Sequence, residues 1–149
     1  MNRIERFIRR IIREELERVI DSRRLLTEYA RVGFMDNLEV IVHTDDPGMT
    51  PHVHIVDKAT RGYDFDCCVR LDMNQYFKHG RHRDEFNSNG CKAFDKFMRS
   101  QCRDERFQNY YEFAVSMWNA NNSHIYIDIK KDGDGKVIVP DYTKISKNK

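Results

Sequence analysis

Alternation of apolar and polar residues between Leu38 and Asp72 constrains the fold of this chain more than any other feature. Three alternating runs, 38–44, 52–57 and 63–72, are separated by residues typical of turns. A period of two indicates β-strands with one buried face, because successive side chains point to opposite faces of a sheet. The three runs therefore predict an antiparallel meander with one apolar face and one polar face.

Helical periodicity occurs on both sides of this predicted meander. The apolar residues of segment 4–20 recur at steps of three and four, which predicts an amphipathic N-terminal helix. A second helical segment is expected over 23–31, ended by Gly33 in the left-handed conformation. Two more helices are expected over 91–98 and 107–118, and the spacing of their aromatic residues favours core packing.

The end of the chain alternates again. Residues 125–130 and 136–139 flank a glycine-containing turn, so a C-terminal β-hairpin is predicted. The predicted fold class is therefore α+β, with an N-terminal helix, a meander, two helices and a terminal hairpin. We expect a single domain over residues 1–149, which consists of an N-terminal helical segment 1–32, an α+β core 38–142 and a frayed tail 143–149.

The composition is typical of a folded, soluble domain. Hydrophobic residues make up 40% of the chain and charged residues 34%, and no apolar run approaches the roughly 20 residues that span a bilayer. Arginines interrupt each short apolar group near the N-terminus, so we expect no secretory leader and a cytoplasmic protein. The four cysteines form no Cys-x-x-Cys pair and are interpreted as buried, reduced thiols. A net charge of +2 is too small by itself to indicate nucleic-acid binding.

Segment 43–54 concentrates ionisable side chains around one turn. His43 ends the first alternating run, Asp45 and Asp46 follow it, and His52 and His54 lie two residues apart in the next run. Residues two apart on a strand share a face, and all three histidines are out of phase with the valines of their own runs. We therefore expect the three imidazoles together on the polar face, exposed to solvent.

This grouping of histidines predicts a site, and its chemistry has several interpretations. One is a divalent metal ion bound by His43, His52, His54 and Asp45, which would activate water. Another is metal-free acid and base chemistry near neutral pH, with His52, His54 and Asp46 as the catalytic residues. The alternative to both is a structural role, in which the imidazoles only form hydrogen bonds at the turn.

Three arginines are candidates for phosphate binding beside this site. Arg70 lies in the third alternating run, and Arg81 and Arg83 lie in the polar segment 78–85. The charge of that segment is equally typical of an ordinary solvated loop. With these arginines, the ligand would be a nucleotide or nucleic acid, and the protein a toxin-like phosphodiesterase. The sequence leaves open whether the chain is an enzyme.

The central turn resembles a family of small uncharacterised bacterial proteins that carry a Pro-Pro-His-Phe-His-Val-type motif. The matching residues are Asp45, Asp46, Pro47, Pro51, His52, Val53, His54 and Trp118. In this chain the two prolines are not adjacent, and Val53 replaces the phenylalanine of the family. Some members of the family are suspected toxin–antitoxin components, so the resemblance implies a similar context. The opening Ile-Ile-Arg-Glu-Glu-Leu also resembles helices of small bacteriophage proteins.

A second class of function rests on the N-terminal helix. The chain would then be a non-enzymatic interaction or assembly protein, such as a phage inhibitor of a host system or a small virion component. The apolar stripe of residues 4–20 would pack on the protein's own core or on a second copy. Its basic end is suited to a membrane surface, a nucleic acid or an acidic partner. The discriminating observation is whether this helix covers the sheet of its own chain.

Overall fold

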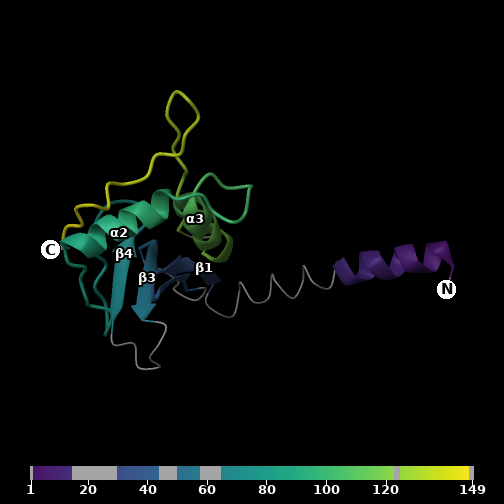
Figure 1. Cartoon of the computed structure of the whole chain (residues 1–149), viewed down its shortest axis with the longest axis horizontal. Helices are drawn as coiled ribbons and strands as arrows, with labels where there is room; N and C mark the ends of the chain where they lie inside the picture. Colours follow the sequence, from purple (N-terminus) through teal and green to yellow (C-terminus); the bar gives the residue numbers. More distant parts are fainter. Residues whose placement is uncertain (1, 15–29, 44–49, 58–64, 123–124, 148–149) are drawn as a thin grey trace.

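The computed structural model describes residues 2–14, 30–43, 50–57, 65–122 and 125–147 (Figure 1). Within these residues one antiparallel sheet of four strands, in the order β1-β2-β3-β4, packs against two helices. This arrangement confirms the predicted α+β class. The elements are β1 (Ala30–Met35), β2 (Leu38–Val42), β3 (His52–Asp57), β4 (Asp66–Arg70), α2 (Ser88–Arg99) and α3 (Tyr110–Asn121).

The predicted meander is present as β2, β3 and β4. Val40 pairs with Ile55, which pairs with Cys67 on its other side, and Val53 pairs with Val69. All five side chains are fully buried in the main apolar cluster. Alternate residues therefore point into one core, as the period of two requires.

Strand β1 replaces part of a segment that the sequence predicted as helix. The predicted helix over 23–31, and the helical segment reaching residue 32, are wrong from residue 30 onwards, because Ala30–Met35 pairs antiparallel with β2. The turn between the two strands contains Asp36 with φ of 55°, the left-handed conformation that two-residue hairpin turns require. Residues 23–29 lie outside the described residues.

Gly33 has a packing role in β1 and does not end a helix. A Cβ atom at this position would lie 3.0 Å from ring atoms of both Phe97 and Tyr110. Those two rings stack on each other, with centroids 4.4 Å apart. The glycine is therefore needed because the helices approach the strand closely here.

The two predicted helices are confirmed as α2 and α3, and both begin with an asparagine cap. The Asn87 side chain accepts a hydrogen bond from Gly90 N at 2.7 Å, and the Asn109 side chain accepts one from Glu112 N at 2.9 Å. The helices pack against each other and against the sheet (Figure 1). Their buried residues Phe94, Met98, Ala114, Val115 and Trp118 complete the core.

The predicted C-terminal hairpin is not confirmed, because its described residues form a turn and one isolated bridge, Lys131 to Val137, without regular strands. Two backbone hydrogen bonds, from Asp132 N to Lys136 O and from Ile138 N to Lys130 O, join the arms close to the turn, and farther from it the first arm is bonded to α3. The Asn119 side chain donates to Ile127 O at 2.8 Å and accepts from Ile127 N at 2.9 Å. This side chain thus takes the place of a neighbouring strand.

The tail predicted to fray over 143–149 is attached along its described part. Ser146 N donates to Asn74 O at 3.0 Å, and Tyr76 N donates to Ser146 O at 2.9 Å. The Asn74 side chain also donates to Lys144 O at 2.7 Å. These backbone bonds hold the tail against the segment that follows β4.

Residues 3–14 form the N-terminal helix that the sequence predicted, and residues 2–14 are all exposed. Residues 15–20 of the predicted helix lie outside the described residues. The apolar face of the sheet is covered by α2 and α3, so residues 3–14 do not supply that cover. In the described part of the chain, no helix combines the length and apolar character needed to cross a membrane.

Candidate metal centre

Five of the six histidines of the chain gather in one cluster beside β3, where the His52 ring also lies 5.4 Å from the Trp118 ring of α3. His43, His52 and His54 come from the end of β2 and from β3, and His79 and His82 come from the segment after β4. Neighbouring ring centroids within the cluster are 4.0 to 5.0 Å apart, namely in the pairs His43–His54, His54–His82, His52–His54, His79–His82 and His52–His79.

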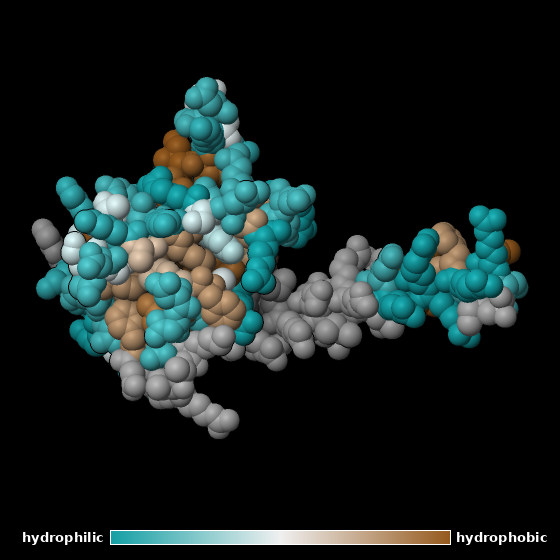
Figure 2. Space-filling view, in the orientation of Figure 1, coloured by the Kyte–Doolittle hydropathy of each residue, from teal (hydrophilic) through white to brown (hydrophobic). Residues whose placement is uncertain are grey.

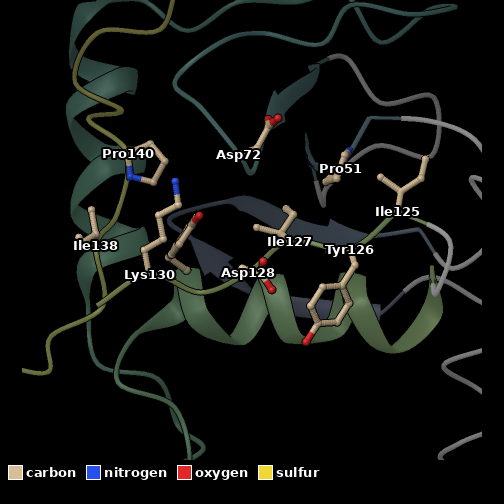
Figure 3. A pocket seen from close by; sticks show the side chains of 10 residues that line it. Pro51, Asp72, Ile125, Tyr126, Ile127, Asp128, Lys130, Ile138 and Pro140 are labelled. Carbon is tan, nitrogen blue, oxygen red and sulfur yellow. The ribbon is translucent and has the colours of Figure 1, made fainter. Parts of the chain in front are cut away.

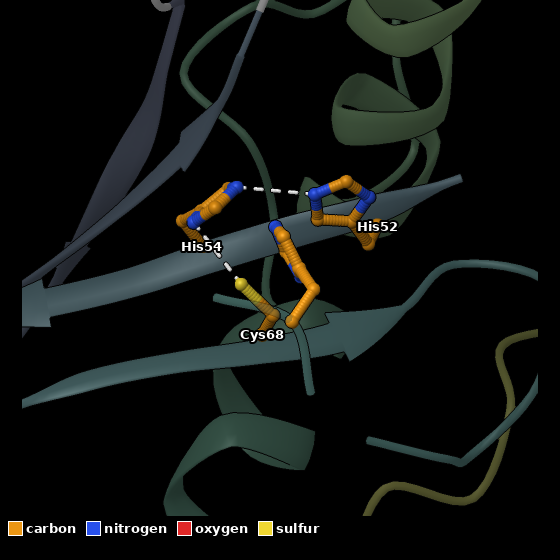
Figure 4. A group of neighbouring side chains, drawn as sticks. His52, His54 and Cys68 are labelled. Carbon is orange, nitrogen blue, oxygen red and sulfur yellow. Dashed lines mark hydrogen bonds between the residues drawn. The ribbon is translucent and has the colours of Figure 1, made fainter. Parts of the chain in front are cut away.

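Strand register places a cysteine thiol directly beside this cluster. His54 pairs with Cys68 across β3 and β4, and the Cys68 Sγ atom lies 3.0 Å from His54 Nδ1. The other nitrogen of His54, Nε2, lies 3.1 Å from His52 Nε2 (Figure 4). All three side chains are buried, with exposed fractions of 0% for His52 and 1% for His54 and Cys68.

Two backbone carbonyls fix the orientation of the His52 and His79 rings. His52 Nδ1 lies 2.7 Å from Thr50 O, and His79 Nδ1 lies 3.0 Å from Phe77 O. A carbonyl oxygen only accepts, so Nδ1 of each ring must carry the proton. Each neutral ring then presents its Nε2 lone pair, the usual arrangement of histidines that bind a metal.

One set of donors that could hold an ion consists of His52, His54, His79 and Cys68. One nitrogen or sulfur atom from each residue lies within 4.8 Å of the other three. Around a tetrahedral zinc ion with Zn–N bonds of about 2.0–2.1 Å, two nitrogens are roughly 3.3 Å apart. The separation of 3.1 Å between the Nε2 atoms of His52 and His54 is close to that edge.

A second set shares two of these residues and adds a carboxylate. It consists of His54, Cys68, Asp66 and His82, whose donor atoms also lie within 4.8 Å of one another. Asp66 Oδ2 accepts a hydrogen bond of 2.6 Å from His82 Nδ1. Asp66 Oδ1 is buried without a hydrogen-bond partner among the described residues, and lies 4.0 Å from His54 Nδ1. A buried carboxylate oxygen in this condition is costly unless a cation or proton donor satisfies it.

Electrostatics keeps the central ring neutral and its neighbouring carboxyl group ionised. Burial lowers the pKa of His54 to about 3, against a raising effect of Asp66 and with further lowering by His43, His52 and His82. Burial raises the pKa of Asp66, but the attraction of the nearby His54 and His82 rings prevails and the pKa is below its usual value. At neutral pH the site therefore offers imidazole lone pairs and a negative charge, the forms in which these groups bind metals.

The structure brings together only part of the metal and catalytic sets predicted from the sequence. His52 and His54 belong to the donor cluster, whereas His43 stacks on the His54 ring at 4.0 Å and belongs to neither donor set. Asp45 and Asp46 lie outside the described residues. The expectation that the three histidines are exposed is wrong for His52 and His54, which are buried.

The cause of this burial is the segment after β4, which covers the polar face of the sheet. The Phe77 ring lies 4.9 Å from the His52 ring, and the His79 ring lies 5.5 Å from the His54 ring. The sequence predicted this segment as a polar connection and placed nothing over the face. The sheet is therefore covered on both sides.

The predicted phosphate-binding arginines are not part of the cluster. Arg70 donates two hydrogen bonds to the Asp72 carboxylate, at 2.8 and 2.6 Å, and a third to Gln75 at 3.0 Å. Its guanidinium group is thus already engaged. Arg81 and Arg83 are exposed on either side of His82, in the segment after β4 that also carries His79.

Sequence reasoning left four members of the donor sets out of its predicted site, although some signals were present. His79 and His82 form a His-Gly-Arg-His sequence, in which Gly80 has φ of 54° and His82 N donates to His79 O at 2.9 Å. This turn brings the two rings to one side. Asp66 and Cys68 alternate with the apolar residues of the run 63–72, which indicates the polar face, but the sequence suggests no more than a buried thiol for Cys68.

A separate surface cavity of about 540 Å³ lies outside the donor cluster (Figure 3). Segment 125–130 forms one wall, and Pro51, Asp72, Tyr111 and Pro140 contribute to the rest. The Tyr111 hydroxyl donates to Leu71 O, and Asp72 is paired with Arg70. Two of the polar groups in this cavity, Tyr111 and Asp72, are therefore engaged within the fold, and we assign no ligand to the cavity.

Comparison of the chain with protein-family models, with curated proteins and with solved structures gives no match, so the site must be interpreted from its own geometry.

Proposed function

We propose that this chain is a metal-binding protein that holds a zinc-like transition-metal ion with His52, His54, His79 and Cys68. The observation that carries the proposal is the convergence of three imidazoles and one thiol within 4.8 Å, in a largely buried position. Nitrogen and sulfur donors in this number and arrangement are those of tetrahedral zinc sites.

A cation suits this cluster better than a metal-free phosphate. Phosphate binding needs positive charge, but the burial that lowers the pKa of His54 to about 3 keeps this ring neutral at physiological pH. The ionised Asp66 beside it would repel an anion. Arg70, the predicted phosphate ligand that lies in β4, is held by Asp72. The charges therefore support a metal ion.

Four protein donors would close the coordination shell, which is characteristic of structural and regulatory sites. The ion would connect β3 and β4 to the segment after β4, because His79 comes from that segment and the other three donors come from the strands. Its binding free energy would then stabilise the cover over the polar face.

The test compares two adjacent cysteines of β4. Cys67 and Cys68 are both buried, at 0% and 1% exposure, but only Cys68 faces the imidazoles. Untagged Cys68→Ala and Cys67→Ala proteins lose similar packing, so Cys67→Ala is a matched control. Each is titrated with Co²⁺ and followed by optical absorption, and the zinc content of each purified protein is measured.

The proposal expects thiolate-to-cobalt absorption in the wild type and in Cys67→Ala, and its loss in Cys68→Ala. It also expects about one zinc ion per chain in the first two proteins. Equal metal content and equal cobalt spectra in the two variants would show that the thiol is not a ligand. A wild-type protein that binds no metal would refute the proposal altogether.

Hydrolysis of a phosphodiester is a second candidate function, favoured by the Asp66–His82 pair. A histidine held by a carboxylate beside a metal ion is arranged to accept a proton from a water molecule. Arg81 and Arg83 flank His82 and would contact the phosphates of a nucleotide or nucleic acid. This role requires an open coordination position, so His79 would not be a ligand during the reaction.

The two candidate functions differ in what His82→Gln should do. If the site is hydrolytic, the variant loses phosphodiesterase activity by at least a hundredfold and retains its metal ion. Single-stranded RNA and bis-p-nitrophenyl phosphate are suitable substrates. Wild-type protein that is fully loaded with zinc and inactive on both would contradict the enzymatic role and leave the metal-binding role standing.

A further inference from the structure

We infer that the helix of residues 3–14 docks on the surface of an anionic lipid bilayer. This proposal does not depend on the metal centre, because it rests on a different part of the chain. It concerns a helix that lies along a membrane surface. Twelve helical residues extend only about 18 Å, which is too short to cross the hydrocarbon core.

The helix has a wide apolar face. With about 100° between successive residues, its large apolar side chains fall within an arc of about 140°. Ile4 is 70% exposed to solvent, Phe7 and Ile12 are each 53% exposed, Ile8 is 49% exposed and Ile11 is 42% exposed. Figure 2 shows hydrophobic atoms at the surface of this segment, among hydrophilic ones. An apolar face that is exposed to water in this way either docks on a partner or promotes aggregation.

The opposite face is strongly basic. Arg3, Arg6, Arg9, Arg10 and Arg13 fall within an arc of about 120°. The segment contains Glu5 and Glu14 as its acidic residues, both at the boundaries between the two arcs, so its side-chain charge is five minus two, or +3. This separation of charge from apolar surface is the pattern of interfacial helices.

Arginines at the boundary are placed to serve both faces. The Arg10 guanidinium group lies 5.6 Å from the centroid of the Phe7 ring, so a cation and an apolar side chain are already in contact there. A long arginine side chain can keep its charge among lipid headgroups while its methylene groups lie beside the acyl chains. The boundary residues thus fit the level of the headgroups.

An anionic bilayer is the occupant that satisfies both faces at once. A second copy of the helix would cover the apolar face but would bring two segments of charge +3 together. A nucleic acid would neutralise the arginines and leave five large apolar side chains in water. Acidic headgroups pair with the arginines, and the acyl chains take up the isoleucines and phenylalanine.

The test uses the full chain and two kinds of vesicle, phosphatidylcholine alone and phosphatidylcholine mixed with phosphatidylglycerol. Arg6→Gln, Arg10→Gln and Arg13→Gln are combined in one variant. The matched control combines Lys130→Gln, Lys131→Gln and Lys136→Gln, which removes the same charge from exposed positions near the C-terminus. A third variant combines Phe7→Ser and Ile11→Ser. Co-sedimentation with vesicles is measured at low and high salt.

We expect the wild type and the lysine control to bind the mixed vesicles and not the neutral ones. The arginine variant should bind about a hundredfold more weakly, since each of the three arginines near an anionic surface contributes about fivefold. The Phe7→Ser/Ile11→Ser variant should also lose binding, because the charges alone do not anchor the helix. Binding of the wild type should weaken as salt is raised.

Several results would overturn the inference. Equal binding to both kinds of vesicle, or to neither, would exclude an anionic lipid surface. A dimer that is abolished by Phe7→Ser/Ile11→Ser, without vesicle binding, would assign the face to a second copy. Binding of duplex DNA that is lost in the arginine variant, again without vesicle binding, would assign the basic arc to nucleic acid.

Discussion

The Nε2 atoms of His52 and His54 lie 3.1 Å apart in the protein interior, and the remaining contacts determine which of them carries a proton. His52 Nδ1 donates to Thr50 O, so His52 Nε2 is bare and must accept from His54 Nε2. His54 Nδ1 is then bare as well and accepts from the Cys68 thiol, 3.0 Å away. Without metal, the cluster is thus a directional chain of hydrogen bonds from Cys68 to Thr50.

This hydrogen-bond chain predicts that metal binding releases a proton. An ion would need the Cys68 thiolate and the Nε2 lone pair of His54, so the thiol proton would leave and the imidazole proton would move to Nδ1. On that side it would face Asp66 Oδ1, the buried oxygen for which the described part of the chain supplies no hydrogen-bond partner. Calorimetric titration with Zn²⁺ near pH 7, in buffers of different ionisation enthalpy, should therefore show about one proton released per ion. Cys68→Ala should release none, and an unchanged value in this variant would place the proton elsewhere.

Removal of the metal should loosen the segment after β4. We expect EDTA to lower the melting temperature and zinc to restore it, because an ion at a thousand times its Kd adds about 4 kcal/mol to stability. His79→Gln should abolish this response, since His79 is the donor that attaches the segment. His43→Gln is the control, because His43 stacks on His54 but belongs to neither donor set. An equal zinc response in both variants would remove His79 from the site.

The metal-free protein should lose stability as the pH falls below about 6.5. Burial lowers the pKa of His54 to about 3 in the folded protein, so the unfolded chain binds one more proton than the folded chain between these two values. Stability contributed by the neutral ring is complete above this window and decreases by about 1.4 kcal/mol per pH unit within it. Asp66, whose pKa is also lowered, acts in the same direction at more acidic pH.

Urea unfolding in EDTA between pH 7 and 5 measures this slope. The slope gives the number of protons that the chain takes up on unfolding. In His54→Gln this number should be lower by about one, whatever the stability of the variant at pH 7. The burial of His54 also means that the substitution costs about 1–3 kcal/mol, more than an exposed position would. A slope that is identical in wild type and variant would show that another group controls the acid response.

Alternation predicted the core of the sheet and the common face of the histidines, because both depend only on the period of two along each strand. Val40, Ile55 and Cys67 pair with one another and face inward, as the alternation predicted for the apolar face. β1 could not be recognised in this way, since Ala30–Met35 contains a bulge between Arg31 and Gly33 that breaks the alternation. Its strand character depends on pairing with β2, which is a tertiary contact.

His79 and His82 reach the donor cluster through contacts between residues that are far apart in the sequence. His79 and His82 follow β4 in a segment without periodic residues, so no local pattern indicates which face it covers. The fold decides this through contacts distant in sequence, such as Tyr76 N to Ser146 O and Phe77 N to Cys68 O. The sequence contained the His-x-x-His spacing, but only the structure places it over His52 and His54.

The Asn119 side chain bonds to the first arm of the predicted hairpin in the way a neighbouring strand would, and its substitution tests this part of the fold. It donates to Ile127 O at 2.8 Å and accepts from Ile127 N at 2.9 Å, so Asn119→Ala leaves both backbone groups without this partner. We expect the substitution to lower the free energy of unfolding by about 1–2 kcal/mol. Alanine's better helix propensity offsets part of the loss, by about 0.5 kcal/mol.

Asn121→Ala is the matched control, since it makes the same change in the same helix. The described bond of the Asn121 side chain is local, to Met117 O one turn earlier, so this variant should change stability by less than about 0.5 kcal/mol. Urea unfolding followed by the fluorescence of Trp118, whose indole N–H donates to Ile125 O, reports on the same junction. If Asn121→Ala destabilises the protein as much as Asn119→Ala, the anchoring role of Asn119 is wrong, and the first arm must be held to α3 by its apolar residues.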